Sequence, residues 1–349
     1  MTKIARNARP TLLQVWAYLL HASGCLWWAE RHLRRRGAVT VLTFHRVLND
    51  AEFQRTCSLP GIVIRRRTFE MLAAYVAAKY DAVDFAGAVE APAGRMRVMF
   101  TFDDGWKDTH TNALPVMCAR GMPATVFVCP GLIGRTLPFW PELVAALLAK
   151  ASPPVTGAEI ESLIESLKSY TTTRRQQFIA RLYALHAPAS GVGEHHADRT
   201  ISWDDIREMD GAGVRFGCHT HTHQILTTVP APAARQEIRK SRAALEGALY
   251  QRCDLFAYPN GNTSAVTRRI LAEEDFRAAF TTQIGAWTGG TDRMAIPRIN
   301  VCEASVVGLT GRFSRAMFQY SVFWKAWRAM RDDRRVPANA RREPVLREA

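Results

Sequence analysis

The sequence has 349 residues and offers little for crossing a membrane or for export. The apolar stretch from Thr11 to Ala29 contains Gln14, His21 and Ser23, so it predicts only a weak transmembrane helix. Positive charge is at least as strong after this stretch as before it, and no small-residue cleavage site stands out. Export is therefore disfavoured, although it stays an alternative. The seven cysteines are scattered and odd in number, which favours reduced thiols over a disulfide framework.

Acidic residues are scarce only at the two ends of the chain. The net charge is +14; residues 1–36 hold seven Lys or Arg against one Glu, and residues 312–349 hold ten against four. Each end thus contributes +6, which leaves only +2 for the 275 residues between them. A nearly neutral body without a nucleic-acid-binding motif argues against nucleic acid as a partner.

Both basic ends also carry large apolar side chains. These are Leu12, Leu13, Val15, Trp16, Leu19, Leu20, Trp27 and Trp28 in the first, and Phe313, Met317, Phe318, Tyr320, Phe323, Trp324 and Trp327 in the second. Basic residues beside Trp and Phe suit an anionic membrane surface. Amphipathic helices that pack on the rest of the chain explain the pattern equally well. We expect a helical arm over 1–36 and a basic tail over 312–349, and we favour a cytoplasmic protein, peripheral on the inner face of the membrane.

The chain between these ends alternates between predicted strands and predicted helices. The strands are expected at 39–44, 97–102, 124–129, 214–218 and 254–258, and the helices at 67–79, 109–121, 203–212 and 233–250. Such alternation indicates an α/β protein with a parallel sheet. A polar, helix-rich segment from about 138 to 200 interrupts the pattern and predicts a helical insertion.

Two clusters of metal-ligating side chains follow predicted strands. The apolar run that begins at Val98 ends in Asp103 and Asp104, and Gly217-Cys-His-Thr-His-Thr-His places His219 and His223 four residues apart. A divalent ion such as zinc needs three protein ligands and an open position to activate water. Neighbouring residues at a strand end point in opposite directions, so one Asp should bind the ion and the other should face the substrate.

Each cluster has a simpler explanation when it is taken alone. Asp-Asp-Gly is typical of a turn or a helix cap, and a His pair four residues apart suits a solvated helix face. The two together, each beside a Gly that permits close backbone approach, favour a site. The adjacent His195 and His196, in a stretch rich in Ala and Gly, are interpreted as solvated rather than as a second metal site.

These motifs resemble the NodB-type polysaccharide deacetylases, which form carbohydrate esterase family 4. Thr101–Gly105 and His219–His223 match the signature without a gap, and the likeness continues through Phe256–Gly261 and Ile296–Ile299. It covers roughly residues 38 to 310. The resemblance implies a deformed (β/α) barrel over about 37–311, with the site at the carboxyl ends of its strands.

The resemblance also implies a role for each residue of the motifs. Asp103 would be the general base, and Asp104, His219 and His223 would hold one divalent ion, with zinc favoured; the middle histidine, His221, is not implied as a ligand. The backbone N–H of Asn260, in Pro-Asn-Gly, would stabilise the oxyanion, so its side chain need not matter.

Two departures from the family pattern bear on the mechanism. Many members carry an Arg that contacts the catalytic Asp where this chain has Ala257, and we assign Arg298 to fill that place. Amide cleavage also needs an acid for the departing amine, yet no His follows His223. A circularly permuted subset of the family has a His at the end of an upstream strand, as His45 is here, and we assign His45 as the general acid. The alternative is a partly buried His that only forms hydrogen bonds at a strand end.

The function implied is metal-dependent removal of N-acetyl groups from a sugar in a polysaccharide or a lipid-linked saccharide, in cell-surface or exopolysaccharide metabolism. Another amide or a cyclic imide is the alternative substrate, because the same fold and ligands serve such molecules. A saccharide-binding protein with a vestigial site is the alternative outside enzymes, and the intact Asp103 argues against it.

Overall fold

The computed structural model describes residues 10–90, 94–135, 139–149, 151, 155–186 and 199–335. Parts of three predicted segments lie outside these ranges: the start of the N-terminal arm, the end of the insertion with His195 and His196, and the tail after residue 335.

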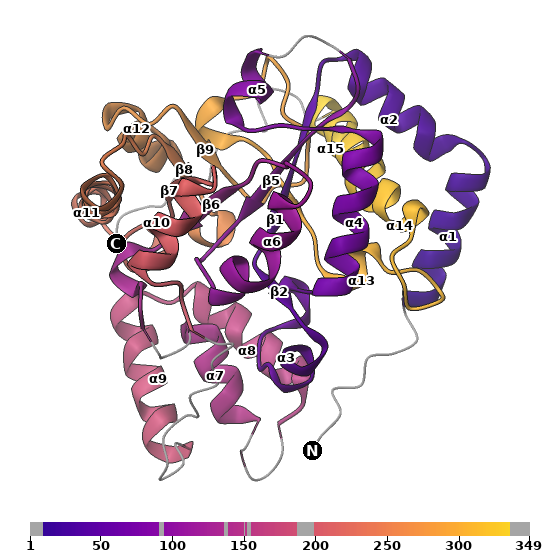
Figure 1. Cartoon of the computed structure of the whole chain (residues 1–349). Helices are drawn as coiled ribbons and strands as arrows, with labels where there is room; N and C mark the ends of the chain where they lie inside the picture. The colour runs from indigo at the N-terminus through magenta and orange to yellow at the C-terminus, as the bar shows by residue number, and fades with distance from the viewer. Residues whose placement is uncertain are drawn as a thin grey trace.

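Parallel strands form the centre of the molecule (Figure 1). In chain order they are β1 (Val39–Phe44), β4 (Asp81–Ala82), β5 (Arg97–Phe102), β6 (Thr125–Val128), β7 (Arg215–Cys218), β8 (Leu255–Ala257), β9 (Ala278–Phe280) and β10 (Ile299–Asn300). Their order in the sheet is β10-β1-β5-β6-β7-β8-β9, with β4 beside β5. Ile296 bridges to Phe280 of β9, and Ile299 pairs with Leu42 of β1, so one short segment links both edges of the curled sheet. The predicted deformed (β/α) barrel is confirmed.

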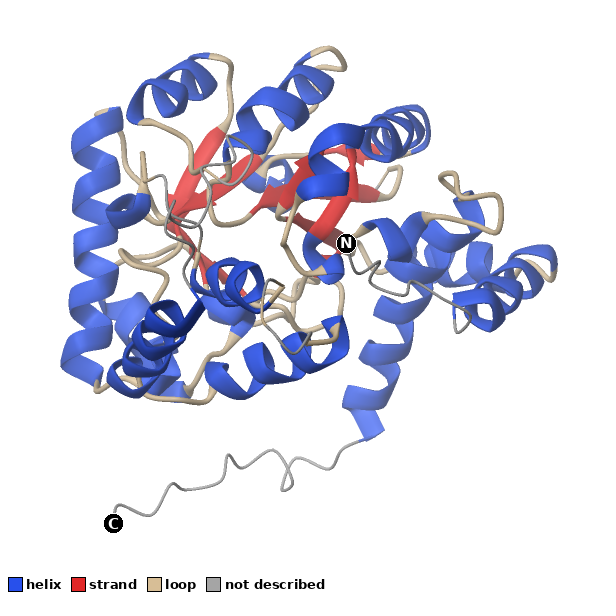
Figure 2. Ribbon diagram, turned by 90° about the horizontal axis from the view of Figure 1, so that it is seen from below, coloured by secondary structure: helices blue, strands red, loops and turns tan. Residues whose placement is uncertain are grey.

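Helices surround the strands, as the view from below shows (Figure 2). They include α4 (Arg66–Lys79), α5 (Phe85–Glu90), the π-turn η2 (Thr109–Ala113) with α6 (Leu114–Cys118), α10 (Trp203–Gly211), α11 (Ala231–Leu249) and α12 (Ala265–Glu273). All five predicted strands and all four predicted helices are present, with ends shifted by three residues or fewer. Strand periodicity and helix periodicity were therefore sufficient to locate them.

Alternation along the strands separates two apolar cores. Leu42, Phe44 and Phe102 face the helices, whereas Val41 and Phe127 belong to a cluster inside the barrel. At Gly217 an added Cβ would lie 2.6 Å from the Phe127 ring, so this position of β7 has no room for a side chain.

Near the carboxyl ends of the strands the inward positions become polar. Thr43 and Thr101 join their hydroxyls at 2.8 Å across β1 and β5. The apolar interior of the barrel therefore gives way to a polar layer at the carboxyl ends of the strands. The predicted site residues lie in this layer.

Two groups of elements extend the barrel on the side of these carboxyl ends, at the bottom of Figure 1. The predicted insertion contains α7 (Trp140–Leu148), α8 (Gly157–Lys168) and α9 (Thr172–His186), which share a small apolar core of their own. The other group was not predicted: β2 (Arg46–Leu48), α3 (Asp50–Arg55), η1 (Pro60–Ile62) and β3 (Val63–Arg65), in which β2 pairs with β3.

The terminal segments are helical and pack together on one side of the barrel. They comprise α1 (Pro10–Ala22), α2 (Cys25–Arg35), α13 (Glu303–Val306), α14 (Arg315–Gln319), η8 (Tyr320–Trp324) and α15 (Lys325–Arg335). Phe318, Val322 and Phe323 are fully buried in the main core, so the segment predicted as a tail from residue 312 is part of the packed structure up to α15. The prediction of a tail rested on the excess of basic residues, and that excess does not prevent the aromatic side chains between them from being buried. Within the described ranges, no helix combines the length and the apolarity that a membrane crossing requires.

Candidate metal centre and catalytic site

Parallel strands of the one sheet deliver the predicted site residues to the edge formed by their carboxyl ends. His45 follows β1, Asp103 and Asp104 follow β5, and His219 follows β7. Phe44 and Phe102 are paired in register, and the Asp103 N–H donates to the Phe44 carbonyl at 2.9 Å. The next positions, His45 and Asp103, therefore continue the inward-facing rows of the two strands.

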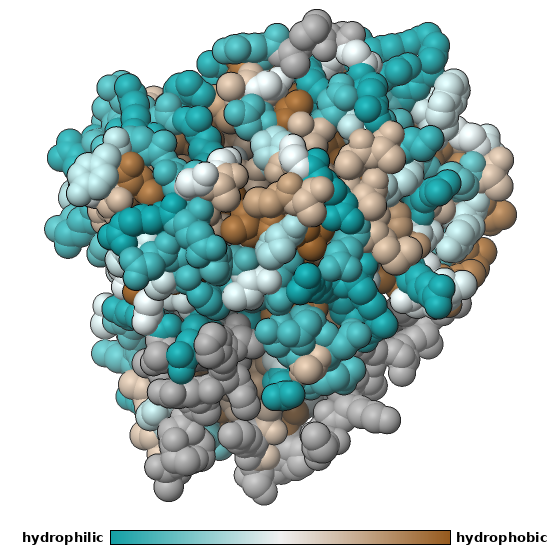
Figure 3. All heavy atoms as spheres, viewed as in Figure 1, coloured by the Kyte–Doolittle hydropathy of each residue, from teal (hydrophilic) through white to brown (hydrophobic). Residues whose placement is uncertain are grey.

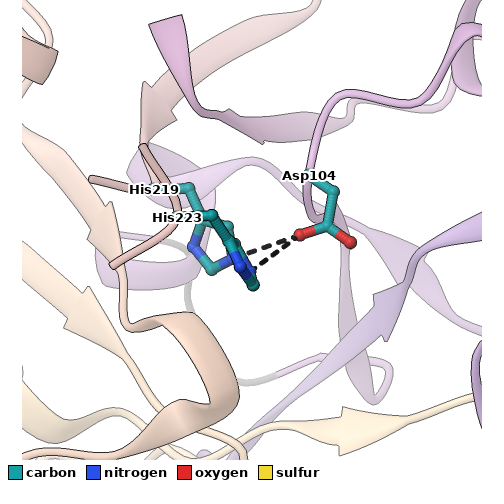
Figure 4. Close-up of side chains that lie close together, drawn as sticks. All are labelled: Asp104, His219 and His223. Atoms are coloured by element: carbon teal, nitrogen blue, oxygen red, sulfur yellow. Dashed lines mark ion pairs between the residues drawn. The ribbon is translucent and has the colours of Figure 1, made fainter. Parts of the chain in front are cut away.

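Asp104, His219 and His223 form one compact cluster (Figure 4). Asp104 Oδ1 lies 3.4 Å from His219 Nε2 and 3.3 Å from His223 Nε2. This carboxylate oxygen is buried and accepts no hydrogen bond from the residues that the structure describes. Burial would raise the pKa of Asp104, but the two histidines hold that pKa well below its ordinary value, so the carboxylate is charged.

The cluster meets the requirements of a divalent ion. Its three ligand atoms all lie within 4.8 Å of one another, and two imidazoles with one carboxylate are a donor set that zinc accepts. His219 Nδ1 lies 2.7 Å from the Ala257 carbonyl, which assigns the proton to Nδ1 and leaves the Nε2 lone pair for an ion. The residues therefore fit the ion that the family resemblance implies, while His221 is not part of the cluster.

Neighbouring groups hold the ligands in place. Trp106 Nε1 donates to Asp104 Oδ2 at 3.0 Å. Glu237 of α11 accepts the backbone N–H groups of His221 at 3.0 Å and Thr222 at 2.8 Å, and the Thr222 hydroxyl at 3.0 Å. One carboxylate thus fixes the turn between the two candidate histidine ligands.

The backbone at two of the candidate ligands, Asp104 and His223, is in the left-handed region. φ is 73° at Asp104 and 60° at His223, and it is 62° at Thr220 between the histidines. Non-glycine residues rarely adopt this conformation, and such strain concentrates at functional sites. The next residue, Gly105, also has a φ of 73°, and an added Cβ there would come within 2.9 Å of the Val128 side chain. The glycine lets the chain turn tightly directly after Asp104.

Arg298 forms a bidentate ion pair with Asp103. Nη1 donates to Oδ1 at 2.8 Å and Nη2 to Oδ2 at 2.6 Å, while Nε donates to the Thr281 carbonyl at 2.9 Å. Arg298 is fully buried and Asp103 is 2% exposed. Burial would raise the pKa of Asp103, but Arg298 and His219 outweigh it and lower the pKa. Arg298 thus contacts Asp103, and its burial favours positioning of Asp103 over contact with a substrate.

His45 belongs to the same electrostatic environment. Burial lowers the pKa of its imidazole, while Asp104 and Asp103 are close enough to raise it. Its Nδ1 is buried and has no hydrogen-bond partner among the described residues. The next residue, Arg46, donates to Asp108 at 2.9 Å, and its guanidinium lies 4.1 Å from the centre of the Trp106 ring. The segment that carries His45 is therefore anchored to the tryptophan that bonds Asp104.

Asn260 follows β8 at the same edge, three residues after Ala257, which bonds His219. It has a φ of 59° within the 3-10 turn η6 (Pro259–Gly261). An added Cβ at Gly261 would collide with Thr282, so the close packing of this turn requires a glycine. The turn holds the backbone of Asn260 at the strand end where the resemblance places an oxyanion donor.

A second group of potential ligands, His110, Asp205 and Glu208, lies between η2 and α10. Lys107 already donates to Asp205 at 2.7 Å, and the Glu208 side chain is 69% exposed. We interpret this group as an ion-pair network at the surface, because the lysine supplies positive charge where an ion would bind.

Sequence reasoning missed Trp106, Glu237 and the pair of Arg46 with Asp108. Trp106 directly follows the Asp-Asp-Gly motif, and an aromatic residue at that position was the one available signal. Glu237 lies in a polar stretch of α11 among other charged residues. Only the fold shows that it reaches the turn between the histidines.

Comparison with known proteins identifies the family. A model of the family named polysaccharide deacetylase matches residues 90–279, which is more than half of the chain. The chain therefore belongs to the polysaccharide deacetylase family, a class of hydrolases, as the motifs predicted. The Bacillus subtilis protein YxkH, described as a candidate polysaccharide deacetylase, is 19% identical over 220 residues. This match covers 63% of the chain and 57% of YxkH, so the chain spans less than two thirds of that relative.

Solved structures share the fold at low sequence identity. The Streptococcus pyogenes deacetylase PplD, in complex with acetate, has a TM-score of 0.52 and 18% identity over 76% of this chain and 92% of its own. IcaB from Ammonifex degensii has a TM-score of 0.52 and 21% identity over 77% of this chain and 93% of its own. These similarities support the barrel architecture.

Proposed function

We propose that this protein is a metal-dependent deacetylase that removes N-acetyl groups from a sugar in a polysaccharide or a lipid-linked saccharide. The observation that carries the proposal is the convergence of Asp103, Asp104, His219 and His223 at one buried strand edge, with the family's motif residues in the family's order. A zinc ion held by Asp104, His219 and His223 would polarise the amide carbonyl and lower the pKa of a bound water.

The side chains around this centre divide the proton transfers. Asp103 is ionised because Arg298 lowers its pKa, and it accepts the proton of the attacking water. The Asn260 N–H stabilises the oxyanion that develops on the carbonyl oxygen. His45 then donates a proton to the departing amine. The pairing of Phe44 of β1 with Phe102 of β5, the residues before His45 and Asp103, supports this role.

The substrate class follows from the family and not from a pocket. Acetate, which is bound to PplD, is also the product that hydrolysis of an N-acetyl group would release. Another amide or a cyclic imide would use the same base and ligands. A vestigial saccharide-binding protein would have no need of a buried arginine paired to Asp103, because such a charge pair is costly to bury.

We also propose a role in cell-surface or exopolysaccharide metabolism, at the cytoplasmic side of the membrane. All seven cysteines are free thiols in the structure, and three of them are buried. Free thiols are compatible with a reducing compartment.

The test is acetate release from N-acetylglucosamine oligomers by the purified protein, first stripped of metal and then reloaded with zinc. Asp103→Asn should abolish release, whereas Asp81→Asn, at a partly exposed carboxylate that pairs with Arg95, should not. Release that needs zinc and Asp103 would establish both the activity and the base. Absence of release from protein with stoichiometric zinc would point to a different acyl substrate or to a binding-only role.

A further inference from the structure

The outer face of α1 and α2 exposes a group of large apolar side chains that we call the α1–α2 face. Its members and their exposed fractions are Leu12 (80%), Val15 (43%), Trp16 (51%), Leu19 (57%), Trp27 (59%) and Trp28 (47%). Hydrophobic residues gather along the right-hand rim of Figure 3, where Figure 1 places these helices. Such a concentration is unusual for a surface that meets only water.

The opposite face of the same helices is already used for packing. Ala17 and Leu20 of α1 and Leu26 of α2 form a buried cluster with Met317 and Tyr320. Hydrogen bonds fix the rotation of α1: Gln14 Nε2 donates to the Val307 carbonyl at 3.1 Å, and His21 Nδ1 lies 2.9 Å from Gln319 Oε1. Helix packing and contact with a membrane, the two explanations of the N-terminal arm, thus concern different faces of α1 and α2. Packing accounts for the buried face but not for the exposed apolar residues of the α1–α2 face.

Positive charge borders this face. Arg31 lies over the Trp27 ring at 5.3 Å, and Arg331 of α15 lies over the Trp327 ring at 4.8 Å. Between α2 and α15 there is a cavity of about 230 Å³ lined by Trp28, His32, Arg36, Trp327, Met330 and Arg331. Of the described part of the chain, two arginines and a histidine but no acidic residue line this cavity, so its chemistry suits a phosphate group.

We propose that the α1–α2 face docks on an anionic phospholipid bilayer, with a headgroup phosphate in the cavity between α2 and α15. An apolar helix face flanked by arginines and tryptophans has the properties of a helix that lies in the membrane interface. The described lining of the cavity is basic and aromatic, so charge complementarity favours the anionic bilayer over a second copy of the same basic surface. The inference does not depend on the deacetylase activity.

The experiment is co-sedimentation of the full chain with vesicles of phosphatidylcholine and 30% phosphatidylglycerol, and with phosphatidylcholine alone. The chain should bind the anionic vesicles and lose binding as salt rises. The apolar pair Trp16→Gln and Leu19→Gln should weaken binding at least tenfold. The basic pair Arg36→Gln and Arg331→Gln should weaken it by about thirtyfold, since each charge near such a surface contributes about 1 kcal/mol. Added inorganic phosphate at the concentration of the lipid phosphate should not displace the protein.

Matched controls separate docking from general stickiness. Val266→Gln with Leu309→Gln removes two apolar side chains that are 50% and 53% exposed elsewhere, and this variant should bind normally. Equal melting temperatures of all variants show that each is folded. Equal loss in this control, or no binding by the parent chain, would overturn the proposal. A parent dimer that Trp16→Gln with Leu19→Gln makes monomeric, without lipid binding, would assign the face to a second copy.

Discussion

Replacement of Arg298 tests whether a buried charge pair positions the proposed base. Arg298→Met removes both hydrogen bonds to Asp103, together with those to the Thr281 carbonyl and to the Thr101 hydroxyl at 3.2 Å. The Arg298 side chain is fully buried, so water cannot replace these hydrogen bonds without entering the barrel. Loss of one partner of a buried pair costs about 3–5 kcal/mol, which is a large part of the stability of a typical domain.

The pH dependence of this loss identifies Asp103 as the group affected. In the variant, burial acts on Asp103 without its main charged partner, so we expect its folded pKa to rise above the unfolded value. A raised carboxyl pKa destabilises the fold at neutral pH, and protonation relieves that cost as the pH falls toward the ordinary Asp pKa near about 4. In the parent chain the pKa is lowered, so Asp103 keeps its stabilising pair over this range. The difference in unfolding free energy should therefore narrow between pH 7 and pH 4.

Urea unfolding of the metal-free proteins at several pH values measures this difference directly. Arg298→Lys keeps the charge but loses the two-pronged contact, so it should lose at least one charge-assisted bond, worth about 1.5–3 kcal/mol. Arg66→Met, which breaks a partly exposed pair with Glu70, should cost about 0.3–0.5 kcal/mol. A loss below about 1 kcal/mol for Arg298→Met, or one that does not change with pH, would refute the reasoning.

Three further predictions concern other parts of the site. His45→Gln should reduce kcat on an N-acetyl sugar by about 10²–10⁴-fold, with a smaller loss on an acetyl ester whose leaving group needs no proton. Because burial lowers the pKa of His45, the activity of the parent chain should fall at a pH below the usual histidine pKa. This alkaline limb of the pH profile should be absent in the variant. Glu237→Gln should weaken zinc affinity by about 10–100-fold, measured by chelator competition, with a matched change at partly exposed Glu70 leaving it unaltered. Gly217→Ala should lower the melting temperature because its Cβ meets the Phe127 ring, at a cost of about 1–3 kcal/mol; an unchanged melting curve would contradict the tight packing of β7 on β6.

Short-range sequence patterns were sufficient for the frame of the barrel. Strands β1, β5, β6, β7 and β8 were predicted because their apolar runs are continuous and bounded by polar turns. β9 and β10 were not predicted, since Ala278–Phe280 and Ile299–Asn300 are too short for a periodic signal. β2 and β3 were missed for the same reason. The C-terminal helices were predicted as a tail because their basic residues outnumber the acidic ones. Net charge does not indicate whether the aromatic side chains of a helix are buried.

The sequence by itself determined that candidate ligand side chains follow strand ends and that Asp103 and Asp104 point in opposite directions, because these follow from local chemistry and a period of two. Only the tertiary structure decided which distant groups support them. Arg298 meets Asp103 across 195 residues of sequence, and Glu237 reaches the histidine turn from α11. It also decided that α1 and α2 pack through one face and expose the other. Such contacts depend on how the sheet curls and where its helices cross, which no local pattern encodes.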